Sequence, residues 1–100
     1  MNKKKIIYSI LKELNDDNTQ LKSETYNISR EEFGSLLEMM QDENLIKDTI
    51  ITRAGQGNKV IFIHLTNTKI KLKGIDYLED NSSLAKTYKG LKEIREWLPL

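Results

Sequence analysis

The chain has 100 residues, which is enough for one domain with one hydrophobic core. Its formal net charge of +1 excludes a protein that is basic throughout, so a surface for nucleic acid would need segregated charge. The absence of cysteine excludes disulfides and thiol chemistry, and the longest apolar run, residues 60–63, is far shorter than the roughly 20 residues of a membrane helix. These features predict a cytoplasmic protein without membrane contact.

Residues 3–15 are predicted to form an amphipathic helix. Five apolar side chains recur at the spacing that forms one stripe on a helix: Ile6, Ile7, Ile10, Leu11 and Leu14. Residues 15–18 end the helix, because Asn and Asp side chains bond to their own backbone and favour turns. Residues 19–27 are weakly patterned, and we expect Leu21 and Tyr26 to anchor this short segment to the core.

The strongest local signal predicts a second helix over residues 29–43. Ser29 and Glu32 form a capping box, in which the Ser29 hydroxyl accepts from the Glu32 amide and the Glu32 carboxylate accepts from the Ser29 amide. Ile28 and Phe33 flank this cap as a hydrophobic staple. The predicted buried face of the helix consists of Phe33, Leu36, Leu37 and Met40.

A β-hairpin is predicted to follow this helix. Ile46, Ile50 and Ile51 mark its first strand, and residues 59–65, rich in β-branched and aromatic side chains, mark its second strand. Residues 53–58 form the turn, because their two glycines permit positive φ.

Two more helices complete the predicted order, a short one over residues 72–79 and a last one over residues 84–98. Helix, hairpin and helix after an N-terminal helix is the order of a small winged-helix domain. We therefore predict an α+β, mainly helical fold, a winged helix-turn-helix with a two-stranded wing and an added C-terminal helix. Within a single domain of residues 1–100, residues 1–80 would form the winged-helix core and residues 83–98 the added helix.

The chain lacks the side-chain groupings of common catalytic sites. Its one histidine, His64, has no cysteine or second histidine with which to hold zinc. Glu31 and Glu32 are neighbours on a helix and point about 100° apart, so they do not form an acid/base pair. Residues 55–59 resemble a phosphate-binding loop but join two strands, whereas that loop joins a strand to a helix. We expect a non-enzymatic protein without a metal or cofactor.

Basic charge is concentrated in the predicted hairpin and at the start of the helix after it. Residues 47–73 contain six basic side chains and one acidic side chain, a net charge of +5 in a chain of +1. Such segregation is the expected footprint of phosphate contact, although the same charges also keep edge strands from aggregating. The predicted contacts to double-stranded DNA come from the wing tip and the start of the second helix: Arg53, Gln56, Asn58, Lys59 and Arg30.

The predicted reading helix has the opposite charge. Residues 29–43 carry one basic and five acidic side chains, a net charge of −4. Their polar face contains Glu31, Ser35, Glu38 and Asp42, which would repel phosphates beside a major groove. Two functions therefore stay open. One is a DNA-binding or transcription-regulating module, and the other is a protein-interaction module that uses the acidic face and binds no DNA.

The last predicted helix carries an apolar stripe that needs a partner: Leu84, Tyr88, Leu91, Ile94, Trp97 and Leu98. One alternative is that this stripe packs against the first helix of the same chain. The other is a homodimer through the C-terminal helix, with Leu84, Tyr88, Leu91 and Trp97 as the dimer or partner surface.

Three segments resemble known bacterial proteins. Residues 73–79 (Lys-Gly-Ile-Asp-Tyr-Leu-Glu) resemble the helix start after the wing in many bacterial winged-helix regulators. Residues 85–97 (Ala-Lys-Thr-Tyr-Lys-Gly-Leu-Lys-Glu-Ile-Arg-Glu-Trp) and residues 7–13 resemble the closing and first helices of the YjcQ family, small proteins of Gram-positive bacteria and their phages. This resemblance extends over nearly the whole chain. It implies a winged-helix fold and a bacterial or phage origin, and it implies no particular activity.

The chain departs from the winged-helix regulator pattern at Lys71, where a helix-capping Thr is expected. Either Thr68 caps an earlier start, or the helix over residues 72–79 is poorly capped, at a cost of roughly 1 kcal/mol.

Overall fold

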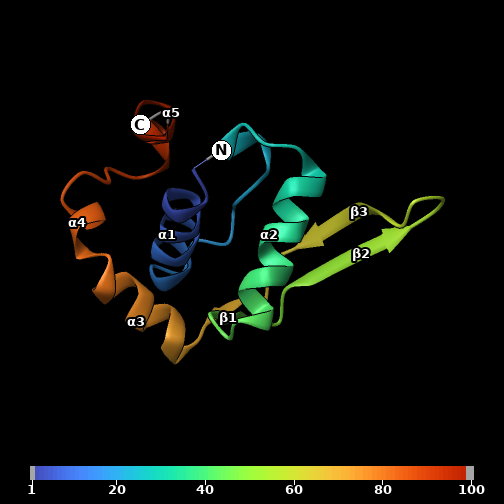
Figure 1. Cartoon of the computed structure of the whole chain (residues 1–100), viewed down its shortest axis with the longest axis horizontal. Helices are drawn as coiled ribbons and strands as arrows, with labels where there is room; N and C mark the ends of the chain where they lie inside the picture. Colours follow the sequence, from blue (N-terminus) through green and yellow to red (C-terminus); the bar gives the residue numbers. More distant parts are fainter. Residues whose placement is uncertain (1, 99–100) are drawn as a thin grey trace.

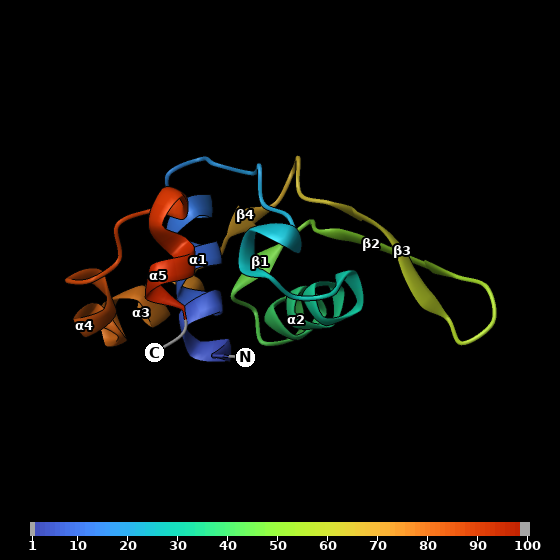
Figure 2. The same cartoon turned by 90° about the horizontal axis from the view of Figure 1, so that it is seen from above.

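The computed structural model describes residues 2–98 and has the predicted α+β class (Figure 1). The helices are α1 (Lys3–Asn15), η1 (Glu24–Tyr26), α2 (Arg30–Asp42), α3 (Leu72–Asp80), α4 (Ser82–Ala85), η2 (Leu91–Glu93) and α5 (Ile94–Trp97). The strands are β1 (Ile46–Lys47), β2 (Ile50–Ala54), β3 (Lys59–His64) and β4 (Lys69–Ile70). Figures 1 and 2 show α1 between α2 and the C-terminal elements, and the β2–β3 hairpin projecting away from the helices.

Helix α1 is the centre of the core and confirms the first predicted helix. Asn2 caps its N-terminus, because the side-chain oxygen accepts from the Lys5 amide at 3.1 Å. The predicted apolar stripe is buried, and Ile10 and Leu11 have no exposed surface. Full burial of one such side chain stabilises the fold by roughly 1.5–3 kcal/mol. α1 therefore organises the packing of the elements on both of its sides.

Helix α2 confirms the second predicted helix and its cap. The Ser29 hydroxyl accepts from the Glu32 amide at 3.0 Å, and the Glu32 carboxylate accepts from the Ser29 amide at 3.2 Å. The predicted apolar face is buried against the core. Leu21 and Tyr26 are buried as well, so the segment around η1 is anchored as expected. These local features place α2 beside α1.

The strand region is less regular than predicted. Two antiparallel ladders follow one another along the same hairpin, with β1 paired to β4 at its base and β2 paired to β3 toward its tip. Between them the chain bends at Asp48, which has a φ of 62°. The Gln41 side chain of α2 binds both backbone groups of Thr49, at 2.9 and 3.1 Å, and the hydroxyls of Thr49 and Thr68 are 2.9 Å apart. A side chain of α2 therefore fixes a bend that the prediction of one continuous first strand missed.

Helix α3 confirms the short helix predicted after the hairpin. Lys71 is its N-cap residue and makes no side-chain cap bond, so the poorly capped alternative is correct. Gly74 lets α3 approach the base of the hairpin closely. A Cβ at this position would overlap the Leu45 carbonyl oxygen and would lie 2.6 Å from Ile70 Cγ1.

The C-terminal region corrects the prediction of one helix over residues 83–98. α4 ends at Ala85, residues 88–90 have no regular structure, and η2 and α5 are separate short elements. Gly90 has a φ of 90°, which a right-handed helix does not contain. The break lets the region curve around α1 (Figure 2), so that Ile94 and Trp97 join the core. The core therefore includes side chains well beyond residues 1–80.

Candidate nucleic-acid interface

Arg53 binds the side of α2 instead of lying free at the hairpin tip. Its Nε and Nη2 donate to the Glu38 carboxylate at 3.0 and 2.7 Å, and its Nη1 donates to Glu31 at 2.6 Å. Nη1 also donates to the Asn58 carbonyl at 3.0 Å, and Nη2 to the Ser35 hydroxyl at 3.3 Å. A guanidinium has five N–H donors, so none is left for a phosphate. The prediction of Arg53 as a DNA contact is therefore not supported by its geometry.

The same contact corrects the interpretation of the acidic face of α2. The bond from Arg53 lowers the pKa of Glu38. The Val60 amide, which donates at 2.8 Å, and then Arg53 lower the pKa of Glu31. In return, bonds to Glu38 and Glu31 raise the pKa of Arg53. The two carboxylates thus hold the hairpin, a contact that the sequence pattern could not show because Arg53 reaches them only in the folded chain.

Two further contacts hold β3 against α2. Gly34 has no side chain, and a Cβ there would lie 2.8 Å from Val60 Cγ2, so the glycine permits the close approach of the strand. Arg30, another predicted DNA contact, is exposed, and its Nη1 donates to the Ile61 carbonyl at 3.3 Å. Arg30 is therefore positioned beside β3 at the start of α2.

The predicted tip residues Gln56, Asn58 and Lys59 are exposed. The turn is closed by a bond from the Asn58 amide to the Gly55 carbonyl at 3.1 Å, and Gly55 and Gly57 have φ values of 77° and 84°. Since Arg53 is bound to α2, Lys59 supplies the basic charge near the tip. The tip is therefore less basic than the sequence suggested.

Much of the basic charge of residues 47–73 gathers at the base of the hairpin. Lys47 and Lys69 are direct cross-strand partners, which places their side chains on one face of the β1–β4 ladder. Lys71 and Lys73 follow at the start of α3, and Lys71 Nζ donates to Asn44 Oδ1 at 3.1 Å. We call Lys47, Lys69, Lys71 and Lys73 the basal cluster. Facing like charges repel, and cations at a helix N-terminus oppose its dipole, so a bound anion would relieve both effects.

The outer face of the hairpin is a surface that sequence reasoning missed. The strand register places on it Ile50, Thr52, Ala54, Lys59, Phe62 and His64. Ile50 and Phe62 are 56% and 59% exposed, and the rings of Phe62 and His64 lie 5.9 Å apart at an interplanar angle of 32°. Both faces of the hairpin are apolar in sequence, so alternation alone could not show which one meets solvent.

The residues predicted as a dimer or partner surface pack within the same chain. Trp97 is 7% exposed, and its ring lies 4.9 Å from that of Tyr88 and 6.3 Å from that of Tyr8. Leu84 and Leu91 are half-buried against the core. This arrangement is the intramolecular alternative, and a homodimer stays a prediction.

A hydrogen-bond network joins this region to α1. The Ser9 hydroxyl lies 2.9 Å from the hydroxyls of both Tyr26 and Tyr88, and the Tyr88 hydroxyl donates to Glu13 at 2.6 Å. Burial is the main cause that raises the pKa of Tyr26 and Tyr88, so both phenols stay neutral donors. The directional hydrogen bonds of this network hold the C-terminal region against α1, in addition to the apolar contacts.

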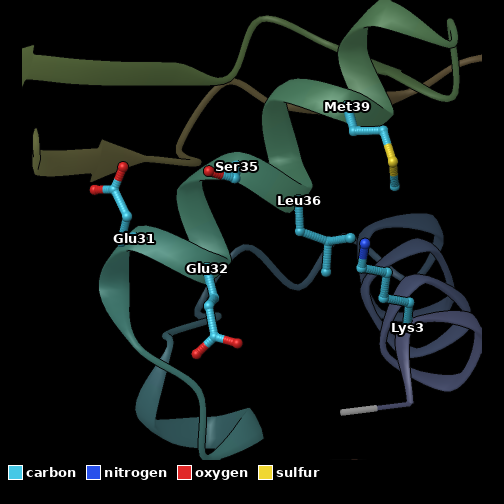
Figure 3. A pocket seen from close by; sticks show the side chains of 6 residues that line it. All are labelled: Lys3, Glu31, Glu32, Ser35, Leu36 and Met39. Atoms are coloured by element: carbon cyan, nitrogen blue, oxygen red, sulfur yellow. The ribbon is translucent and has the colours of Figure 1, made fainter. Parts of the chain in front are cut away.

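A pocket of about 240 Å³ lies between the first turn of α1 and α2 (Figure 3). It is lined by Lys3, Glu31, Glu32, Ser35, Leu36 and Met39. Figure 3 shows the Glu31 carboxylate near the strands and the Glu32 carboxylate directed elsewhere, so the two do not form an acid/base pair. Over residues 2–98, no three His, Cys, Asp or Glu side chains are grouped to hold a metal ion, and no helix is long and apolar enough to cross a bilayer.

The structure defines the class as a small α+β protein with a projecting hairpin and a basic hairpin base. The family model described as "YjcQ protein" matches residues 4–97, and the chain belongs to the YjcQ family. The "Uncharacterized protein YjcQ" of Bacillus subtilis (strain 168) is 28% identical over 98 residues, which are 98% of this chain and 99% of that protein. The resemblance found in residues 7–13 and 85–97 is thereby confirmed. No solved structure matches the chain.

Proposed function

We propose that this YjcQ-family protein is a non-enzymatic winged helix-turn-helix module that binds double-stranded DNA and acts in bacterial or phage transcription regulation. In this proposal η1 and α2 form the helix-turn-helix, and the hairpin is the wing. The element order supports it, because an antiparallel hairpin directly follows α2 and a further helix follows the hairpin.

The observation that carries the proposal is the basal cluster. Lys47 and Lys69 face each other across β1–β4, and Lys71 and Lys73 stand next to them at the start of α3. α3 has no side-chain cap at this end, so its first backbone amides add partial positive charge. A polyanion with regularly spaced phosphates fits such a group of cations. The acidic side chains close to the cluster in sequence are Asp48, which follows Lys47, and Asp76, three residues after Lys73 on α3.

The acidic character of α2 limits how the DNA is read. Glu32, Asp42 and the C-cap residue Glu43 are exposed, and Arg53 offsets one of the two negative charges of Glu31 and Glu38. Their charge disfavours insertion of α2 into a major groove. Phosphate contacts position a protein but carry no sequence information. We therefore expect binding with little preference among sequences.

The alternative, a protein-interaction module that uses the acidic face of α2, has less support. Two of the three acidic side chains on that face, Glu31 and Glu38, are already bound to Arg53 of the same chain. A basic partner would have to displace this internal contact. Asp42 alone would remain for the partner.

The proposal is tested by fluorescence anisotropy of a labelled mixed-sequence duplex at about 50 and about 200 mM salt. We expect affinity that falls steeply with salt. A variant with Lys47→Ala, Lys69→Ala and Lys73→Ala should lower the slope of log K against log salt by about two to three, because each lost phosphate contact accounts for about 0.9.

The matched control is Lys86→Ala with Lys89→Ala and Lys92→Ala, which removes the same charge from an exposed segment away from the hairpin. It should change the slope by less than half as much. Equal effects of the two triple variants, or no binding by the unmodified protein at low salt, would contradict the proposal.

A further inference from the structure

The outer face of the hairpin presents an aromatic surface that no residue of the described range 2–98 covers. Phe62 and His64 are alternate residues of β3, and their cross-strand partners Thr52 and Ile50 are exposed on the same side. Phe62 and Ile50 each leave more than half of their surface in solvent. A monomeric protein gains no stability from such exposure, so the surface is available to a ligand.

The rings on this face are suited to flat aromatic ligands. The Phe62 and His64 rings lie 5.9 Å apart and 32° from parallel, so they form a nearly continuous platform along β3. Both side chains stand on a paired strand, and Arg53 and Val60 fix that strand against α2. The platform is thus held in place before any ligand binds.

The charge around the platform favours an anionic ligand. Lys59 is on the same face, and Lys22 and Arg30 line a hollow that also borders Phe62. Glu24 is the acidic side chain of that hollow, and its carboxylate accepts from the Ser23 hydroxyl at 2.6 Å. The outer face carries no acidic side chain, so a second copy packed face to face would offer Lys59 no opposite charge and fits poorly.

An unpaired nucleic-acid strand combines the two required properties. Its phosphates are anionic, and its bases offer exposed aromatic faces, whereas a duplex hides those faces within its stack. We propose that the outer face of the hairpin binds unpaired nucleotides by stacking bases on Phe62 and His64, with Lys22, Arg30 and Lys59 beside the strand. This inference rests on the proposed function, and it specifies a nucleic acid with a single-stranded segment.

The test compares two labelled probes by fluorescence anisotropy at low salt: a blunt 12-base-pair duplex, and the same duplex with a six-nucleotide dT overhang. We expect the overhang to tighten binding about tenfold, which is the effect of stacking one or two bases. Phe62→Leu keeps an apolar side chain of similar size but removes the ring. It should abolish the gain from the overhang and leave binding of the blunt duplex unchanged.

Two further variants and one further probe make the test selective. Phe62→Trp should keep the gain, and its added fluorescence should be quenched by the overhang. Met39→Ala removes another partly exposed apolar side chain, on α2, and should change neither probe. A labelled Glu-Tyr copolymer represents an acidic aromatic peptide and should not bind through Phe62.

The possible results of this test distinguish a failure of the inference from a failure of the proposed function. Equal binding of the two duplex probes, or an unaltered gain in Phe62→Leu, would overturn the inference while the proposed function stands. Phe62-dependent binding of the copolymer without any gain from the overhang would overturn it in favour of a peptide. The absence of binding to either duplex would overturn the proposed function together with the inference.

Discussion

The helical body around α1 and the β2–β3 hairpin differ in what holds them in place. In the body, apolar side chains from α1, α2 and α5 share one core, and buried hydroxyls of Ser9, Tyr26 and Tyr88 bond to one another. The hairpin contributes only the partly buried Ile51 and Ile63 to this core, and it is further held by Arg53 and by the close contact of Val60 with Gly34. Its outer side is apolar and open to solvent.

This difference shows that the hairpin was not shaped for stability alone. A strand pair that only supported the fold would direct its large apolar side chains to the core and charged ones to solvent. Here Ile51, Val60 and Ile63 do face the body, but Ile50 and Phe62 point outward and Arg53 points inward to α2. The hairpin thus leaves on its outer side an apolar surface that the body does not use.

The largest expected difference in stability between the two regions comes from truncating one aromatic ring in each of them. Trp97→Ala should destabilise the protein by about 3–5 kcal/mol, because it leaves a cavity beside α1. Phe62→Ala should change stability by less than about 0.5 kcal/mol, since its ring is already in solvent. Urea unfolding followed by circular dichroism measures both values. Similar losses would mean that the hairpin face is part of the core after all.

A second comparison adds one methyl group at each of two close contacts. Gly74→Ala would drive a Cβ into the Leu45 carbonyl, a backbone atom of the body that cannot rotate away, and should cost about 1–3 kcal/mol. Gly34→Ala meets the methyl groups of Val60, a side chain that can adjust more easily than a backbone carbonyl, and about 1 kcal/mol of improved helix propensity offsets part of the strain. Thermal unfolding should therefore rank Gly74→Ala well below Gly34→Ala, and the reverse order would show that the Val60 side chain adjusts less easily than the Leu45 backbone.

Removing one hydroxyl from each region gives a smaller contrast. Ser9→Ala leaves the buried Tyr26 hydroxyl without its partner, at a cost of about 1–2 kcal/mol. Ser35→Ala removes an exposed acceptor 3.3 Å from Arg53, a side chain that retains four other bonds, and should be nearly neutral. Denaturant midpoints of the two variants and of the unmodified protein provide the measurement. A neutral Ser9→Ala would show that the network adds nothing to the body.

The smallest expected effect is a pH-dependent loosening of the hairpin. The pKa values of Glu31 and Glu38 are lowered from 4.5, so their bonds to Arg53 are fully present above that pH and are lost as the pH falls through the lowered values. The protection factor of the Val60 amide against hydrogen exchange should then fall, while amides of α1 stay protected. In the double variant Glu31→Gln with Glu38→Gln, the protection of the Val60 amide should no longer change with pH in this range, because the two titrating carboxylates are absent. Hydrogen exchange followed by NMR below pH 4.5 measures the Val60 and α1 amides in both proteins. An equal loss of protection in α1 would contradict the idea that the hairpin loosens independently of the body.

The elements with local signals could be predicted from the sequence. The stripe of α1 and the capping box of Ser29 and Glu32 depend on residues within a few positions, and both were correct. The family could be inferred from short segments at the two ends of the chain. The C-terminal helix was wrong because its apolar spacing fits a helix, whereas Gly90 adopts a positive φ and lets the chain bend around α1.

The candidate site was harder to predict because it depends on contacts between distant residues. The charge count of residues 47–73 was right, but it could not show that Arg53 binds Glu31 and Glu38 while Lys47 and Lys69 stand together. A register irregularity between Thr52 and Arg53 helps to decide which strand residues face α2. Such irregularities leave no periodic signal.

The contact between the two ends of the described chain has a consequence for synthesis on the ribosome. Lys5 Nζ donates to the carbonyl of Trp97, 92 positions later, at 2.7 Å, and the same ammonium lies 4.9 Å from the Trp97 ring centroid. α1 leaves the exit tunnel before Trp97. The side of α1 that packs against Trp97 is therefore covered only once residue 97 has emerged, and it must stay in solvent until translation has passed this residue.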